Sequence, residues 1–219
     1  MESVIRNFIK NGDAVSSKEL YQERGFGVKP ATIRAELNKL TKQGYLRQPH
    51  TSGGRVPTDA GYRFFVEKLV NDRVATAQSL AEKMHKTIDH RLGEFIDEMS
   101  GMLNLLGVGY GATEKKVYKS GLEELVAGLD TITKSDIFNI VSDFEHVDER
   151  IKSLSSYLDG QSPKVFIGKS PITRSENLSV VADVYNLDGE KIILAAIGPK
   201  RMNYQKVIGM FKMLKDHDK

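Results

Sequence analysis

The chain of 219 residues contains no cysteine. This absence excludes disulfides, thiolate metal sites and cysteine nucleophiles, and it suits a reducing compartment, so we expect a cytoplasmic protein. No stretch approaches the ~20 consecutive apolar residues that a membrane-spanning helix needs. The start of the chain also lacks the apolar block and the cleavage site of a secretory signal. We therefore expect no association with a membrane.

Side-chain patterns typical of an enzyme or a metal site are also lacking. None of the five histidines lies in an HExxH motif, and His85 and His90 are five residues apart, so they sit poorly on one helical face. No GxSxG motif is present, and residues 107–111 lack the GK[ST] ending of a phosphate-binding loop. We predict a protein without catalytic residues, metal or cofactor. An enzyme built on the C-terminal half is a competing hypothesis.

The net charge of +3 is unevenly distributed along the chain. Residues 1–73 hold 13 Lys and Arg against 8 Asp and Glu, whereas the remainder has a slight acidic excess. Between residues 29 and 55, six basic side chains accompany a single acidic one, Glu36. A local cluster of positive charge is typical of a phosphate-binding surface, although a solvated basic face would give the same count.

The start of the chain shows the apolar spacing of three short helices. Residues 2–11 are predicted to form the first. Ser16 and Glu19 form a capping box at the start of the second, which we place at residues 17–24. Pro30 suits the first position of the third helix, because no amide donor is needed there.

A short hairpin is predicted to follow these helices. Residues 45–48 form its first strand, Val56 begins the return strand, and a turn-rich segment with two glycines joins them. Thr58 and Asp59 then start a fourth helix. The order helix, helix, helix, strand, glycine loop, strand is that of a winged helix, so we predict a winged helix-turn-helix over residues 1–73.

In a winged helix-turn-helix, the third helix fits the major groove of DNA. Burial of Ile33, Leu37 and Leu40 would leave the opposite face of that helix outside. The candidate DNA contacts on this face are Lys29, Ala31, Thr32, Arg34, Ala35, Asn38, Lys39 and Lys42. Arg34 can bind a guanine edge, Asn38 can pair with an adenine, and the small side chains can contact a thymine methyl. The lysines are better suited to phosphates.

The glycine loop between the two strands is the predicted wing. The candidate DNA contacts in the wing are His50, Thr51, Ser52, Gly53, Gly54 and Arg55. Its glycines would let backbone amides approach a phosphate, and Arg55 could reach the neighbouring minor groove. A plain hairpin turn would use the same residues, so that alternative stays open.

A long helical pattern begins the rest of the chain. Apolar side chains step by three or four residues over 75–106, which predicts an amphipathic helix. Its apolar stripe could pack on its own chain or form a coiled-coil-like seam with a partner chain. Residues 107–111, with three glycines, are predicted to break this helix and to act as a joint.

Helices and then strands are predicted after the glycine-rich segment. Residues 117–159 are expected to be mostly helical. One apolar face of these helices is predicted to consist of Ile137, Ile140, Val141 and Phe144. Strands are expected at 164–168, 178–185 and 191–197, the last two joined by an Asp-Gly turn. The chain then ends in a helix capped by Asn203.

Three segments resemble the HrcA family of bacterial heat-shock repressors. They are VSSKEL (15–20), KPATIRAELNKLTKQGYLRQPHTSGGRVPTDAGYRFFV (29–66) and IGPKRMNYQKVI (197–208), and the second is long and highly specific. The resemblance implies a repressor that binds, as a homodimer, an inverted-repeat operator in double-stranded DNA upstream of chaperonin and DnaK-type chaperone genes. It also implies a GAF-like second domain and a chaperonin partner. The family's DNA-reading helix falls on residues 29–42 and its wing on 50–55.

This chain is shorter than the family's pattern. The early strands of the GAF-like domain and the inserted dimerisation segment are expected to be missing around residues 107–117. We predict an α+β protein in three parts: a winged-helix domain at 1–73, a long linking helix at 74–106 that takes over part of the dimer contact, and a reduced GAF-like domain at 107–219. The alternative function is that of a ligand-sensing winged-helix regulator with a GAF-like sensor domain.

Overall fold

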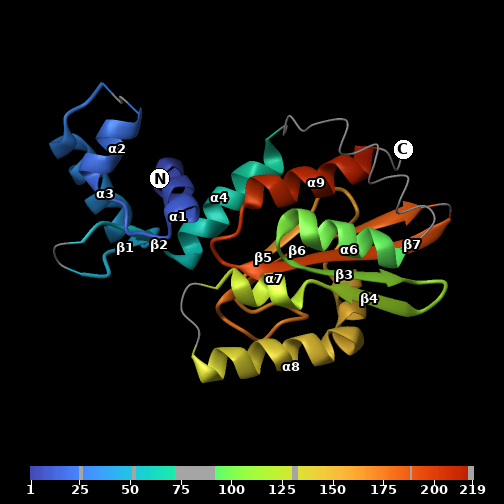
Figure 1. The fold of residues 1–219 in the computed structure, drawn as a ribbon. Helices are drawn as coiled ribbons and strands as arrows, with labels where there is room; N and C mark the ends of the chain where they lie inside the picture. The colour runs from blue at the N-terminus through green and yellow to red at the C-terminus, as the bar shows by residue number, and fades with distance from the viewer. Residues whose placement is uncertain (25–26, 51–52, 73–91, 130–132, 188, 217–219) are drawn as a thin grey trace. The chain divides into compact units, whose positions relative to one another are not determined.

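The computed structural model describes residues 1–24, 27–50, 53–72, 92–129, 133–187 and 189–216. The chain forms two compact units, Met1–Lys68 and Leu69–Lys219 (Figure 1). Most of the predicted linking helix, residues 73–91, lies outside the described residues. Among the residues that are described, no helix combines the length and the apolar character needed to cross a membrane.

The first unit consists of helices and a two-stranded sheet. Its elements are α1 (Glu2–Asn11), α2 (Ser17–Arg24), α3 (Pro30–Lys42), β1 (Leu46–Arg47), β2 (Val56–Pro57) and the start of α4 (Asp59–Asn71). The strands are antiparallel, and an isolated bridge between Val15 and Arg55 extends the pairing toward the start of α2. These elements lie where the sequence predicts them.

Local signals in the sequence set the ends of these helices. The Glu19 amide donates to Ser16 Oγ at 3.2 Å and the Ser16 amide donates to Glu19 Oε2 at 2.7 Å, which confirms the predicted capping box of α2. Pro30 begins α3 as expected, and the Gly61 amide donates to Thr58 Oγ1 at 3.2 Å at the start of α4. The core of this unit contains Val4, Val15, Leu20, Ile33, Leu37 and Leu46, with Phe8 and Leu40 packed against it.

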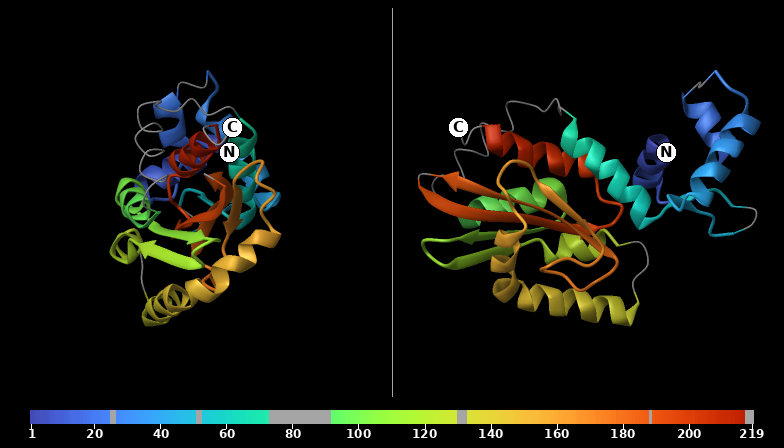
Figure 2. Two further views of the ribbon diagram at one scale, coloured as in Figure 1. Left: turned by 90° about the vertical axis from the view of Figure 1, so that its right-hand side faces the viewer. Right: turned by 180° about the vertical axis from the view of Figure 1, so that it is seen from behind.

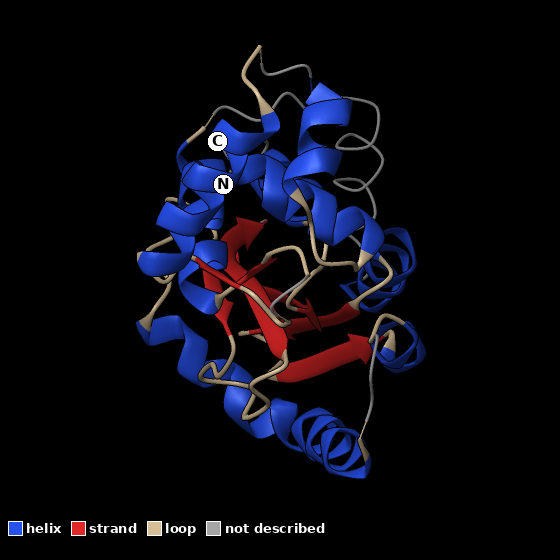
Figure 3. Ribbon diagram, turned by 90° about the vertical axis from the view of Figure 1, so that its left-hand side faces the viewer, coloured by secondary structure: helices blue, strands red, loops and turns tan. Residues whose placement is uncertain are grey.

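The second unit is built on a five-stranded antiparallel sheet with the order β4-β3-β7-β6-β5. Figure 3 shows its strands in red, with helices around them. The strands are β3 (Leu106–Gly111), β4 (Lys116–Ser120), β5 (Lys164–Ile167), β6 (Leu178–Leu187) and β7 (Glu190–Pro199). The helices are α6 (Leu92–Leu103), α7 (Leu122–Ala127), α8 (Lys134–Arg150), the 3-10 helix η1 (Ile151–Ser156) and α9 (Tyr204–Asp216). This unit is therefore α+β, as predicted.

Helices cover both faces of this sheet. Helices α6 and α9 lie on one face, and α7 and α8 lie on the other (Figures 1 and 2). Alternate residues of β6 point to opposite faces: Val180 and Ala182 join the core beneath α8, whereas Ser179 accepts a hydrogen bond from Tyr204 of α9 at 2.8 Å. Buried apolar side chains from the sheet, α7, α8 and η1 fill the space on the α8 side.

The glycine-rich segment 107–111 forms strand β3, so the prediction of a break and joint there is wrong. A Cβ added to Gly107, Gly109 or Gly111 would lie on the face of the sheet that α6 covers. A Cβ at Gly107 would lie 2.8 Å from Met99 Cε, and one at Gly109 would lie 2.8 Å from Ile96 Cδ1. The glycines therefore let α6 approach the sheet closely, which is one use of glycine within a strand.

Two further predictions about this region are corrected. The predicted helix to residue 106 ends at Leu103, and residues 116–120 form β4 instead of a helix. Strands are therefore present in the segment 107–117, where we expected them to be missing. The sequence did not indicate β4, because this short strand carries two lysines and lacks a clear alternation of apolar and polar residues.

Helix α8 buries a different face from the one predicted. Ile140 is buried and Phe144 is half-buried, but Ile137 and Val141 are exposed. The inner face instead includes Asp143, whose carboxylate accepts hydrogen bonds from Arg150 Nη1 at 2.8 Å and from the backbone amides of residues 174 and 175. A buried carboxylate with this many donors is stable in the core, which an apolar pattern could not indicate.

The end of the chain follows the prediction. Strands β6 and β7 form a hairpin in which Leu187 pairs with Glu190, and Gly189 in the connection has a φ of +82°. The Lys206 amide donates to Asn203 Oδ1 at 3.1 Å, so Asn203 caps α9. The inward side chains of α9 are those expected, namely Val207, Ile208, Phe211 and Leu214.

One carboxyl group lies fully buried on the α9 face of the sheet. Asp183 Oδ1 accepts a hydrogen bond from the Val184 amide at 2.8 Å, and Lys215 Nζ lies 3.8 Å away. Asp183 Oδ2 has no hydrogen-bond partner among the described residues. Burial raises the pKa of this carboxyl group, and the bond from Val184 and the charge of Lys215 oppose that rise.

Candidate nucleic-acid interface

The outward face of α3 is exposed along its full length. Ile33 and Leu37 are buried beneath it. The predicted contacts on α3 and just before it are all exposed, namely Lys29, Ala31, Thr32, Arg34, Ala35, Asn38, Lys39 and Lys42. Within the described part of the chain, the four basic side chains among them take part in no ion pair. The positive charge of this face is therefore available to a ligand.

A hollow of about 390 Å³ lies where α2, α3 and the hairpin meet. Its polar lining comes from Arg34 and Asn38 of α3, from Ser16 and Ser17 at the start of α2, and from the hairpin. The start of a helix presents unpaired backbone amides and the positive end of the helix dipole. Arg34 and the start of α2 thus place positive potential on the same hollow.

Arg55 folds back from the hairpin onto α3. Its Nε donates to Thr41 Oγ1 at 3.0 Å and its Nη2 donates to Asn38 Oδ1 at 2.6 Å. Thr41 in turn donates to the Leu37 carbonyl at 2.8 Å, so its hydroxyl accepts and donates at once. The guanidinium group therefore joins the predicted wing to the predicted reading helix.

This contact fixes the orientation of the Asn38 amide. An arginine has only hydrogen-bond donors, so the atom of Asn38 that faces Arg55 is its carbonyl oxygen. The Asn38 amide nitrogen has no partner within the described residues. Asn38 thus offers its amide donors to a ligand, whereas the Arg55 bond uses one of the two lone pairs of its carbonyl oxygen. A bidentate adenine contact would have to use the other lone pair.

The two glycines of the hairpin have different surroundings. A Cβ at Gly54 would lie 2.5 Å from the Ala14 carbonyl oxygen and from Val15 C, so glycine is required where the hairpin crosses the Val15 bridge. Gly53 has more room, since a Cβ there would lie 3.3 Å from the nearest atom, the His50 carbonyl oxygen. Gly54 is therefore needed for packing, a reason that differs from the phosphate contact suggested by the sequence.

The other predicted wing residues are only partly described. His50 is exposed, and its carbonyl accepts a hydrogen bond from the Gly53 amide at 2.9 Å. Thr51 and Ser52 lie outside the described residues. The structure thus brings Gly53, Gly54 and Arg55 into the hollow beside α3.

The prediction of contacts omitted four polar side chains on this surface, namely Ser16, Ser17, Arg47 and Gln48. Arg47 and Gln48 of the hairpin are exposed, and Gln48 Nε2 donates to the Gly53 carbonyl at 3.2 Å. Ser17 begins α2 and lines the hollow. Alternation along the first strand could have found Arg47, because buried Leu46 precedes it. The position of Ser17 directly after the capping serine was also a visible signal.

No group of three or more His, Asp or Glu side chains in the described ranges is arranged to hold a metal ion. Glu19, near the start of α2, has a lowered pKa because the Ser16 amide and hydroxyl hydrogen-bond to its carboxylate. The surface therefore offers positively charged side chains and amide N–H groups, which are suited to binding phosphate oxygens and hydrogen-bond acceptors on bases.

Comparison with known proteins gives one family. The model of the HrcA protein C terminal domain matches residues 61–208. The chain is 40% identical over 97 residues to the heat-inducible transcription repressor HrcA of Beutenbergia cavernae, a match that covers 44% of this chain and 26% of that protein. It is 32% identical over 124 residues to the repressor of the same name from Acetivibrio thermocellus, covering 57% of this chain and 34% of that protein.

The matches thus span between about a quarter and a third of these relatives' length. A crystal structure of a hypothetical protein at 2.2 Å resolution has the same fold, with a TM-score of 0.78 and 17% sequence identity. That similarity covers 99% of this chain and 94% of the other.

Proposed function

Because this chain belongs to the HrcA family, we propose that it is a transcriptional repressor that binds double-stranded DNA through its first unit. The observation that carries the proposal is the exposed cationic face of α3, which has no ion-pair partner among the described residues and adjoins the hollow at the start of α2. We interpret the first unit as a winged helix-turn-helix, in which α3 enters the major groove and the hairpin is the wing.

The exposed residues of α3 divide by chemistry. Arg34 is the candidate for a guanine edge, since its guanidinium group can bind two acceptors at once. Ala31 and Ala35 let the helix backbone approach the bases, and the Thr32 methyl can contact thymine. Lys39 and Lys42 are candidates for phosphates, together with the first amides of α2.

In this proposal Asn38 reads DNA through its amide nitrogen. With its carbonyl oxygen held by Arg55, the side chain can donate to a base acceptor such as guanine N7 or O6, adenine N7 or thymine O4. Arg55 then acts as a positioning residue, because its contacts with Asn38 and Thr41 keep its guanidinium group on α3. A reach of Arg55 into the minor groove would require both contacts to break.

The wider biology belongs to the same proposal. The family resemblance supports a homodimer in the cytoplasm, an inverted-repeat operator upstream of chaperonin and DnaK-type chaperone genes, and a chaperonin partner. A repressor of this kind acts by binding, so we propose no enzymatic activity. The five-stranded antiparallel sheet with helices on both faces supports a GAF-like second unit.

The described core between the sheet and α8 does not favour the alternative of a small-molecule sensor. The space between the sheet and α8 is filled by buried side chains such as Val108, Ile140, Val147 and Ala195, each no more than 1% exposed. A ligand there would have to displace this core.

A titration of labelled duplexes tests the proposal. The purified full chain should bind an inverted-repeat operator at least tenfold more tightly than a scrambled duplex of the same length and salt concentration. Arg34→Ala should reduce this preference by roughly 1–3 kcal/mol at one position of each half-site. Equal affinity for the operator and the scrambled duplex, or no binding to either, would overturn the proposal.

A further inference from the structure

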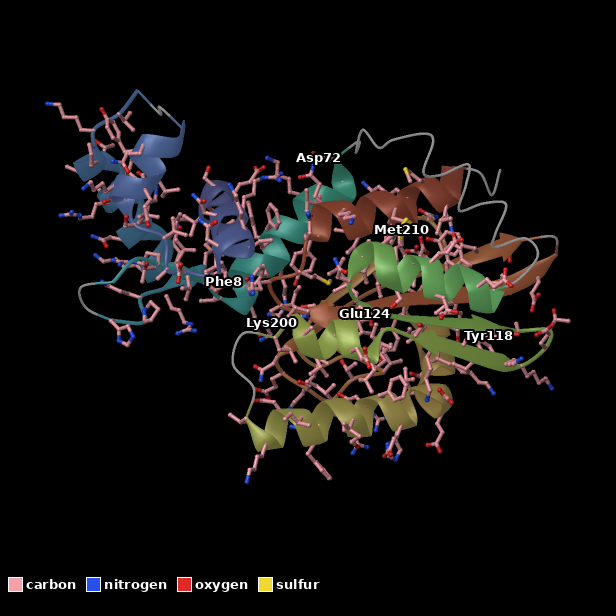
Figure 4. All side chains as sticks on the ribbon, viewed as in Figure 1. Phe8, Asp72, Tyr118, Glu124, Lys200 and Met210 are labelled. Carbon is pink, nitrogen blue, oxygen red and sulfur yellow. The ribbon has the colours of Figure 1, made fainter. Side chains whose placement is uncertain are left out.

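Helix α8 carries an unusual apolar patch on its outer face. Ile137 is 45% exposed, Phe138 is 74% exposed and Val141 is 40% exposed. Side chains project from this helix on the side away from the sheet (Figure 4). Three neighbouring large apolar side chains on one exposed helix face are typical of a surface that another protein covers.

The outer face of α8 is a distinct stripe. Its residues are Lys134, Phe138, Val141 and Glu145, spaced by four, three and four positions. At roughly 100° per residue, these four fall within about 60° of one another around the helix axis. The buried residues Ile140, Asp143 and Val147 lie on the opposite side. The side chains of the stripe therefore do not contribute to the core beneath the helix.

The two ends of the stripe carry opposite charges. Lys134 lies in the first turn of α8 and Glu145 lies in the fourth, and both are exposed. Neither side chain forms an ion pair with another described residue. The apolar centre is thus flanked by one basic and one acidic side chain that lack partners within the described chain.

This pattern is complementary to itself when two copies of α8 run antiparallel. In a two-fold symmetric antiparallel pair, residues lie opposite each other when their numbers have a constant sum. The register that places Phe138 against the partner's Val141 also places Lys134 against the partner's Glu145. Both pairings occur twice, so two apolar contacts lie between two ion pairs. The spacing is that of the alternating core positions of an antiparallel coiled coil.

We propose that the outer face of α8 is a homodimerisation surface, on which a second copy of this chain packs its own α8 antiparallel. A different partner protein would need an acidic end, an apolar centre and a basic end in the order that complements this stripe. A second copy of α8 in antiparallel orientation presents that order by symmetry. The inference rests on the proposed function in one respect: an operator that is an inverted repeat requires two copies of the chain to bind it. One helix pair buries less than the ~800 Å² per partner of a standard interface, so the contact is weak and reversible.

Charge exchange at the two ends of the stripe tests this register. Sedimentation velocity of the full chain at several concentrations should show a monomer–dimer equilibrium. Lys134→Glu places two acids together at both ends of the pair, and Glu145→Lys places two bases together. Each single change should raise the dimer dissociation constant about tenfold, and the double variant K134E/E145K should restore it. Phe138→Ala should weaken the dimer as well.

Glu123→Lys is the matched control, because it makes the same charge change at an exposed position on α7 and should leave the constant unchanged. A chain that stays monomeric at all concentrations would overturn the proposal. It would also be overturned if the single charge changes had no effect, or if the double variant failed to restore association.

A second arm separates this inference from the proposed function. A duplex with a single half-site requires only one copy, so the variants of α8 should bind it as the unaltered chain does. Failure of the unaltered chain to bind that duplex, together with dimerisation that responds to the charge exchange, would refute the proposed function and leave the α8 surface supported.

Discussion

Replacement of Arg55 tests the link between the hairpin and α3. Arg55→Ala removes the hydrogen bonds to Asn38 Oδ1 and Thr41 Oγ1, together with two long contacts of Nη1 with the carbonyls of Gly53 and Gly54 at 3.4 and 3.5 Å that we expect to contribute little. A buried hydrogen bond from a charged donor contributes about 1.5–3 kcal/mol, but Arg55 is half exposed, so roughly 1 kcal/mol for each bond is the reasonable figure. We expect Arg55→Ala to lower the free energy of unfolding of the first unit by roughly 2 kcal/mol, and Arg55→Lys by about half as much.

A double-mutant cycle with Asn38→Ala measures the contact itself. Urea unfolding of the full chain, followed by circular dichroism, should give a coupling free energy of roughly 0.5–1.5 kcal/mol between the two positions. Arg47→Ala is the control, since Arg47 is exposed on β1 and should show no coupling with Asn38. Additive effects of the Arg55 and Asn38 changes would refute the reasoning.

Asn38→Asp separates the two roles of this side chain. The carboxylate would retain, and strengthen, the bond from Arg55, so the first unit should be at least as stable as before. It would lose the amide donors and add a negative charge, so operator affinity should fall sharply. A variant that kept both stability and operator affinity would show that the Asn38 amide nitrogen does not contact DNA.

Three other predictions follow from charges and close contacts. Lys39→Ala should weaken binding to all duplexes alike and reduce the slope of log affinity against log salt by about 1; a change confined to the operator would contradict a phosphate contact. Gly54→Ala should lower the urea midpoint of the first unit, at a cost of roughly 1–3 kcal/mol, because its Cβ would meet the backbone of residues 14 and 15 at 2.5 Å, whereas Gly53→Ala should have a smaller effect. Burial raises the pKa of Asp183, so the stability linked to its protonation is present below the ordinary Asp pKa and is lost as pH rises through the raised value. The urea midpoint of Asp183→Asn relative to the unaltered chain should therefore increase as the pH rises above the ordinary Asp pKa, and a constant difference would argue against the raised pKa.

Local signals predicted the first unit well. The capping box at Ser16, Pro30 at the start of α3 and the apolar positions Ile33 and Leu37 each act within one or two helical turns, so the sequence alone indicates them. The direction of Arg55 depends on two acceptors 14 and 17 positions earlier in the chain. No periodicity encodes such a contact, and the sequence equally suggested an outward arginine.

The errors in the second unit have a common physical cause. Glycine at every other position of residues 107–111 indicates a break when it is considered alone, but beneath α6 it makes a flat strand surface. In α8, the apolar side chains at positions 137 and 141 suggested a buried face, while the side that is buried contains a charged residue, Asp143. Both cases depend on what packs against the element, which local spacing does not contain.

The outermost strands of the five-stranded sheet bear on how copies of this chain can meet. Strands β4 and β5 are short, with five and four residues, and both carry lysines: Lys116 and Lys119 on the first, Lys164 on the second. Short border strands with lysines resist the addition of a foreign strand. Two copies are therefore discouraged from joining their sheets edge to edge, so a dimer of the kind proposed above would have to form through side-chain surfaces such as the outer face of α8.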